Sequence, residues 1–266
     1  MEILAYIAAV LIGISLGMIG SGGSILTVPV LVYLLHINPL LATTSSLFIV
    51  GTTSLAGGLR AYARGLVDFK AVTEFGIPSI FSIFVTRHYI FPAIPSQLFT
   101  IGGELVTKEM LLMVVFALLM LAASITMIRT REEDVITTTE KDRHHMAVPL
   151  LLFGILIGFI TGLLGAGGGF VIIPTLVIFL KLPMRTAVGT SLLIIAVNSL
   201  FGFLFSLKQF EFDWKLLLIF TGLAIAGIYI GSRLAEKITP GTLKRGFGWF
   251  VLVMGIYIII KEIFLP

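Results

Sequence analysis

Residues 12–23 read IGISLGMIGSGG, and residues 157–168 read IGFITGLLGAGG. When the chain is shifted by 145 residues, every glycine of the first stretch falls on a glycine of the second, which is the mark of an internal repeat. Other residue types also coincide further along: Pro29 with Pro174, Asp68 with Asp213, and Lys70 with Lys215. Apolar composition alone would align Leu with Ile but not these residues. The chain therefore consists of two related halves.

The composition indicates that lipid, and not water, surrounds most of this chain. Hydrophobic residues make up 58% of it, charged residues 12%, and the mean hydropathy is +1.10. A membrane-spanning helix needs about 20 mostly apolar residues. Runs close to that length and nearly free of charge cover 111–128, 148–164, 191–207, 216–234 and 247–260. A membrane β-barrel would show short alternating strands instead, so the sequence predicts an all-α polytopic membrane protein.

Each half is expected to contribute five helical elements. In the first half we place them at 3–19, 25–35, 41–63, 71–90 and 108–128, and in the second at 148–164, 170–180, 186–207, 214–234 and 245–262. Between them lies a stretch dense in charge and threonine. We therefore expect a first transmembrane repeat over 1–128, a charged cytoplasmic linker over 129–147 and a second transmembrane repeat over 148–266.

Basic residues set the expected orientation, because short cytoplasmic loops are enriched in Lys and Arg. Arg60, Arg64 and Lys70 place their connection in the cytoplasm. An odd number of elements per half then inverts the second half, which predicts two inverted-topology repeats in a multi-pass protein of the cell (inner) membrane. Arg87 and Arg233 fall near predicted helix ends, where snorkelling suffices, with a role as gate charges as the alternative.

The glycine stretches end in short elements that cannot cross a hydrocarbon core of about 30 Å. The sequence therefore predicts Gly-rich broken or re-entrant helices that meet near the bilayer midplane. A helix starting at Ser24 or Gly169 would point free N–H groups and the positive end of its dipole into this region, which suits an oxyanion. Close helix packing is the expected role of Gly13, Gly17, Gly158 and Gly162, and it is the alternative role for the glycine-rich turns. The candidate substrate-binding residues are Gly20, Ser21, Gly22, Gly23, Ser24, Gly165, Ala166, Gly167, Gly168 and Gly169.

Polar residues follow each glycine stretch and extend the candidate site. Hydroxyls at Thr44, Ser45 and Ser46 and at the matched Thr190 and Ser191 could donate to an anion, or could bond their own helix backbone instead. Asn198 lies in mid-span, where its amide needs a partner. It is a candidate substrate contact, with hydrogen bonding between helices as the alternative.

The doubled glycine series, followed by Pro29 or Pro174 and by AVGTSL at 187–192, resembles the TauE/SafE sulfite exporter family over nearly the whole chain. The resemblance implies a secondary transporter, most often an exporter, of small sulfur-containing or organic anions such as sulfite, sulfoacetate or other sulfonates. It also implies alternating access, with proton coupling as an option. The first half departs from the pattern with Ser24 in place of Gly169, which makes its part of the site more polar.

Other classes of function find less support. The chain has no cysteine, its four histidines form no metal or acid–base spacing, and no Gly-Lys-Ser/Thr follows either glycine stretch. We therefore expect no enzyme, no catalytic residue, no metal and no cofactor. The expected partners are a small anionic substrate and the lipid bilayer, without nucleic acid; monomer and homo-oligomer both stay open. An anion channel is the alternative function, followed by a membrane-bound enzyme or an assembly subunit.

Overall fold

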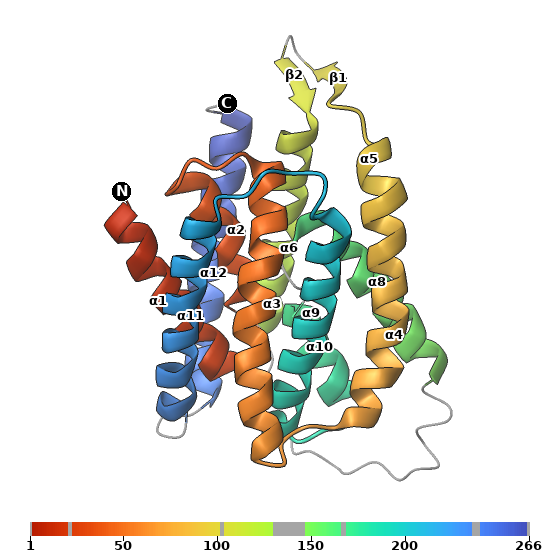
Figure 1. Ribbon diagram of the computed structural model, residues 1–266, viewed down its shortest axis with the longest axis vertical. Coiled ribbons are helices and arrows are strands. Elements are labelled where there is room, and N and C mark those ends of the chain that lie inside the picture. The colour runs from red at the N-terminus through yellow and green to blue at the C-terminus, as the bar shows by residue number, and fades with distance from the viewer. Residues whose placement is uncertain are drawn as a thin grey trace.

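The computed structural model describes residues 2–20, 23–101, 104–129, 147–165, 169–235 and 240–264 and is almost entirely helical (Figure 1). Its first part contains α1 (Glu2–Ile19), α2 (Ser24–Tyr33), α3 (Pro39–Ala63), α4 (Phe69–Val85), the π-helix η1 (Thr86–Ile90), α5 (Phe91–Ala93) and α6 (Lys108–Arg129). Its second part contains α8 (Ala147–Leu164), α9 (Gly169–Ile178), α10 (Met184–Ser206), α11 (Trp214–Leu234) and α12 (Pro240–Phe264). The all-α fold class is confirmed.

Between α5 and α6 the described chain forms strands, which the sequence did not predict. Here β1 (Gln97–Ile101) and β2 (Glu104–Thr107) form a two-stranded antiparallel hairpin. The hairpin projects from one end of the helical bundle (Figure 1). A lone hairpin contributes little stability, so the helices carry the fold.

Equivalent side chains start equivalent helices in the two halves. The carboxylate of Asp68 accepts a hydrogen bond from the backbone N–H of Ala71 at 3.0 Å, and that of Asp213 accepts one from Leu216 at 3.1 Å. Both are N-caps, which satisfy a backbone donor that the first helical turn leaves free. The aligned aspartates of the repeat thus begin α4 and α11.

Five helical segments of the described chain are long and apolar enough to cross a membrane. They cover Pro39–Ala63, Phe69–Ala93, Lys108–Ile125, Met184–Ser206 and Trp214–Leu234, while shorter apolar segments cover Ile3–Ile19, Ser24–Tyr33 and Pro149–Leu164. Large apolar side chains stay exposed on the outer faces, among them Leu4, Ile77, Leu218 and Val253. Exposed apolar surface of this extent suits contact with lipid.

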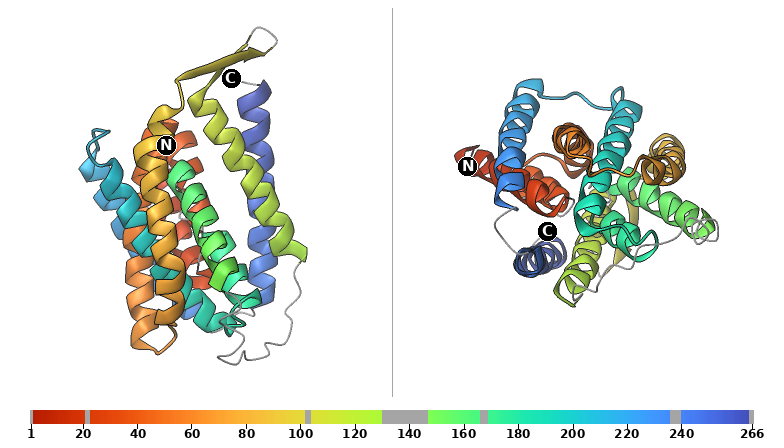
Figure 2. Two further views of the ribbon diagram at one scale, coloured as in Figure 1. Left: turned by 90° about the vertical axis from the view of Figure 1, so that its right-hand side faces the viewer. Right: turned by 90° about the horizontal axis from the view of Figure 1, so that it is seen from below.

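Helices of one half pack on helices of the other. α3 and α10 lie together at the centre, with α1 against α11 and α4 against α8 (Figure 1). Figure 2 shows α6 and α12 running side by side along one flank, in agreement with their contacts. The equivalent helices of the two halves are α1 and α8, α3 and α10, α4 and α11, and α6 and α12. Exchanging the halves therefore turns the α1–α11 contact into the α8–α4 contact and leaves the α3–α10 and α6–α12 contacts unchanged.

The same exchange holds at single residues. A Cβ added to Gly57 would lie 3.2 Å from Leu192, and one added to the equivalent Gly202 would lie 3.1 Å from Leu47, which is the equivalent of Leu192. The glycines that begin each series approach the other half equally closely. Gly13 packs on the carbonyl of Ala224, and Gly158 packs on the carbonyl of Ser79. Close helix packing, which the sequence predicts for these two glycines, is confirmed.

The backbone repeats as well. His36, after α2, has φ +54°, and its equivalent Lys181, after α9, has φ +49°. L-residues other than glycine rarely adopt this left-handed conformation, so its recurrence reflects a shared turn and not chance. The inverted topology of the halves in a membrane stays a prediction, as do the repeat boundaries, and most of the linker over 129–147 lies outside the described residues.

Candidate site at the second glycine turn

The chain leaves α8 through a left-handed turn at Gly165. Its φ is +67°, and an added Cβ would collide with the carbonyl oxygen of Thr43 on α3. Glycine tolerates both conditions, and other residues do not. The Ser46 hydroxyl, buried and 2.6 Å from the carbonyl oxygen of Gly165 and 2.9 Å from that of Thr43, holds this turn against the first turns of α3.

An arginine lies beside this turn. Thr86 packs on α8 at Gly162, and Arg87 follows it within the π-helix η1. The side chain of Arg87 is 0% exposed. Its Nη1 donates to the Thr44 hydroxyl at 2.9 Å, and that hydroxyl also lies 3.3 Å from the Leu40 carbonyl oxygen. Arg87 and the predicted site residue Thr44 therefore form one cluster.

The snorkelling predicted for Arg87 is wrong. Helical structure continues without a break over Phe69–Ala93, because η1 joins α4 to α5. Position 87 therefore lies inside the bundle and not at a helix end. The signal for this was weak, because the Phe91-Pro92 pair after it suggests that the helix ends near there.

Two of the three guanidinium nitrogens of Arg87 remain open. Nε and Nη2 have no hydrogen-bond partner among the described residues, and no carboxylate of that part of the chain pairs with the guanidinium. The guanidinium also lies near the ring of Phe91, whose centroid is 4.9 Å from Cζ. A buried cation without a counter-ion is costly, so this site has unused capacity for a negative charge.

A second cation lies on the same aromatic ring. Lys108 is 7% exposed, and its Nζ lies 4.0 Å from the centroid of Phe91 and donates to the carbonyl of that residue. Glu109 follows Lys108 directly in the chain. Two buried cations from different helices thus lie close to the ring of Phe91, and the local charge is positive.

The first glycine turn has the equivalent contacts but different polar groups. Gly20 has φ +83°, and an added Cβ would lie 2.6 Å from Val188 on α10, the residue equivalent to Thr43. At the position equivalent to Arg87 stands Ser232, whose hydroxyl accepts from Nη1 of Arg60 at 2.6 Å. Unlike Arg87, Arg60 is partly exposed. A guanidinium therefore bonds the residue at this position too, but it comes from α3.

The remaining predicted site residues are spread over the bundle. Ser45, Gly23 and Ser24 are buried, with Gly23 packed on α1 and Ser24 at the start of α2; Gly169 starts α9. Thr190 accepts from the backbone N–H of Asp68 at 2.9 Å, and Ser191 donates to Val188. Asn198 accepts from Ser79 at 2.8 Å. Ser21, Gly22, Ala166, Gly167 and Gly168 lie outside the described residues.

The structure thus brings Thr44, Ser46 and Gly165 close to Arg87, while Thr190 contacts the α3–α4 connection and Ser191 bonds its own helix. The first cluster offers donors with a net positive charge and no acidic group among its described members. It is chemically suited to hold an anion. Which of the other predicted residues touch a substrate stays a prediction.

The comparisons with known proteins agree with a transport role. The family model described as Sulfite exporter TauE/SafE matches residues 5–258. A "Probable membrane transporter protein" of Xylella fastidiosa (strain Temecula1) is 30% identical over 94% of this chain and 91% of its own. Two further relatives carry the same description. MJ0441 of Methanocaldococcus jannaschii is 28% identical over 97% of this chain and 95% of its own. YunE of Bacillus subtilis is 25% identical over 98% of this chain and 100% of its own. No solved structure matches significantly.

Proposed function

Because this chain belongs to the TauE/SafE sulfite exporter family and is a multi-pass membrane transporter, we propose that it carries small sulfur-containing or organic anions, such as sulfite, sulfoacetate or other sulfonates. The observation that supports the anion is Arg87, fully buried with Nε and Nη2 open. Ionisable groups inside a membrane protein mark substrate pathways by default. A guanidinium is also the side chain best suited to bind an oxyanion through two parallel hydrogen bonds.

The neighbouring backbone favours the same ligand class. α9 begins four residues after Gly165 and contains ten residues, so its N-terminus presents free N–H groups and a positive dipole end near the turn. A sulfonate or sulfite has three oxygens that only accept hydrogen bonds. It therefore matches a cluster in which the open groups of Arg87 are all donors.

The proposed mechanism is secondary transport by alternating access, with export as the direction. It is supported by the exchanged contacts of the halves, in which Gly20 packs on Val188 while Gly165 packs on the equivalent Thr43. Such symmetry lets a small movement of one half open one end and close the other. Arg87 is buried, whereas Arg60 is partly exposed. The two ends of the proposed transport path therefore already differ in their access to solvent.

Counterflow separates this proposal from an anion channel. Proteoliposomes preloaded with unlabelled sulfoacetate should accumulate external radiolabelled sulfoacetate transiently above equilibrium, and the initial rate should saturate. A channel gives no such overshoot. An imposed pH gradient that changes the rate would support proton coupling, and an unchanged rate would oppose it.

A further inference from the structure

The β1–β2 hairpin brings a lysine back to the helical segment that contains Arg87. Lys108 is the first residue after the hairpin. Its backbone N–H donates to the carbonyl oxygen of Ser96 at 3.1 Å, and its Nζ donates to that of Phe91. Both acceptors precede the hairpin in the chain. The hairpin therefore closes a loop that fixes Lys108 beside Phe91.

This connection is longer than its counterpart in the second half. There, α11 ends at Leu234 and α12 begins at Pro240, so the counterpart is too short for a hairpin like β1–β2. The hairpin and the position of Lys108 are thus additions to one half of the repeat. The helix packing that both halves share does not explain them.

Lys108 lies on the inward face of α6. Leu112 and Phe116 follow it at intervals of four residues, so they share its face of the helix, and both are buried. A lysine at the end of a membrane helix can extend to the membrane surface, but Lys108 is itself buried. Of its three N–H groups, one bonds Phe91, and no described residue accepts from the others.

Arg87 and Lys108 are held near each other by the same ring. The centroid of Phe91 lies 4.9 Å from Cζ of Arg87 and 4.0 Å from Nζ of Lys108, so the two charged groups are at most about 9 Å apart. Like charges this close repel each other, and burial strengthens the repulsion. No carboxylate of the described chain forms an ion pair with either group.

A singly charged anion would neutralise only half of this pair. A sulfonate bound at the open Nε and Nη2 of Arg87 compensates one cation and leaves the other buried without a counter-charge, which is costly. A dianion compensates both. Hydrogen bonds from a cation to an oxyanion are about 2.7–2.9 Å long, so the separation of the two cations suits an anion whose negative groups are joined by a single carbon.

We propose that Arg87 and Lys108 together select compact dianions, in which a sulfonate binds Arg87 and a second anionic group, such as a carboxylate, binds Lys108. This inference rests on the proposed function and narrows its substrate class to dianions of the sulfoacetate type. Lys108 is then a specificity-determining residue. The hairpin serves to hold it at the site.

The alternative is a lysine that only stabilises the fold. Basic side chains can bond the last carbonyls of a helix, and Lys108 bonds that of Phe91 close to the end of α5. Such a lysine would affect all substrates alike, whereas a binding lysine acts on dianions. Isethionate separates the two cases, because it has the sulfonate and nearly the size of sulfoacetate but a hydroxyl group in place of the carboxylate.

The test measures the KM for uptake of radiolabelled sulfoacetate and isethionate into proteoliposomes. We expect the wild type to have a KM at least about tenfold lower for sulfoacetate. Lys108→Gln should raise the KM for sulfoacetate about tenfold or more and leave that for isethionate within about threefold, while Lys108→Arg keeps the wild-type preference. Lys208→Gln, which changes an exposed lysine, should alter neither KM.

Equal KM values of the wild type for the two anions would overturn this inference, and so would an equal effect of Lys108→Gln on both, or no effect on either. If Lys108→Gln does not fold, the preference of the wild type and its retention in Lys108→Arg decide. Uptake of isethionate or sulfite without uptake of sulfoacetate would overturn the inference and leave the proposed function standing. Absence of wild-type flux for all three anions would overturn the proposed function itself.

Discussion

Arg87 donates to the hydroxyl of Thr44 over 2.9 Å, and this bond connects a buried charge with a residue that the repeat pattern predicts for the substrate site. The remaining donors of the guanidinium have no partner in the described chain. A protein that needed Arg87 only for stability would be expected to pair it with a carboxylate. The open donors of Arg87 therefore favour a role in binding an anion.

Replacing Arg87 with methionine should raise the melting temperature of the anion-free protein or leave it unchanged. A buried ion replaced by an apolar side chain of similar volume is often neutral or stabilising by about 1–4 kcal/mol. Thermal unfolding of the purified variant in detergent measures this. Sulfoacetate should raise the melting temperature of the wild type but not that of Arg87→Met, because only the wild type binds it. A variant that melts well below the anion-free wild type would assign Arg87 to the fold instead.

Gly165→Ala should destabilise the protein by at least about 2 kcal/mol. The left-handed conformation costs an L-residue about 1–2 kcal/mol, and the added methyl group would also collide with the Thr43 carbonyl. Gly222→Ala is the matched control, because a Cβ there meets nothing within 4 Å and alanine favours a helix by up to about 1 kcal/mol. Denaturation midpoints compare the two. Equal midpoints would show that the turn at Gly165 is not fixed as described.

Ser46→Ala should loosen the second glycine turn and slow transport. It removes the donor to the Gly165 carbonyl at 2.6 Å and leaves that buried oxygen unsatisfied, at a cost of about 1–3 kcal/mol. Ser124→Ala, whose hydroxyl donates only to Leu121 of its own helix in the described chain, is the control. Initial rates of sulfoacetate uptake should fall for the first variant and not for the second. A lower uptake rate for Ser124→Ala than for Ser46→Ala would show that the turn at Gly165 does not affect transport.

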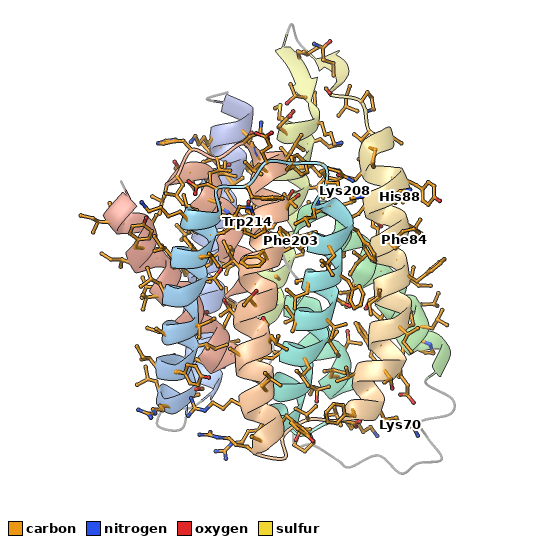
Figure 3. All side chains as sticks on the ribbon, viewed as in Figure 1. Lys70, Phe84, His88, Phe203, Lys208 and Trp214 are labelled. Atoms are coloured by element: carbon orange, nitrogen blue, oxygen red, sulfur yellow. The ribbon has the colours of Figure 1, made fainter. Side chains whose placement is uncertain are left out.

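The inverted topology predicts that Lys70 and Lys208 lie on opposite sides of the membrane. Figure 3 shows Lys70 at one end of the bundle and Lys208 toward the other, on the side of His88 and Trp214. Because the chain lacks cysteine, Lys70→Cys and Lys208→Cys can be labelled individually on intact cells. A membrane-impermeant maleimide should modify position 208 at once and position 70 only after permeabilisation. Labelling of both positions from outside would contradict the topology.

The sequence predicted the helices closely because lipid imposes a simple pattern on them. The short elements expected at 25–35 and 170–180 correspond to α2 (Ser24–Tyr33) and α9 (Gly169–Ile178). The glycine series marked both turns correctly, at Gly20 and Gly165. Differences of a few residues arise where caps such as Asp68 decide the first turn, since capping depends on local geometry and not on hydropathy.

The site could be predicted only in part. Thr44, Ser46 and Gly165 were predicted from their place in the repeat, but the hydrogen bond of Arg87 to Thr44 was not. That connection needs η1 to carry the helix past residue 85 and needs α3, α4 and α8 to meet, which are contacts between distant segments. The hairpin at 97–107 was missed for a related reason. Its strands lie outside the apolar runs, where no lipid-imposed pattern applies.

The central claim is that an anion bound at Arg87 is transported, and uptake of radiolabelled sulfoacetate into proteoliposomes tests it most directly. Wild type, Arg87→Gln and the exposed control Arg185→Gln should be compared at equal reconstitution. We predict saturable uptake by the wild type and by Arg185→Gln, with Arg87→Gln reduced about tenfold or more, because charge-assisted hydrogen bonds contribute about 1.5–3 kcal/mol. Uptake by Arg87→Gln at the wild-type rate would contradict the claim.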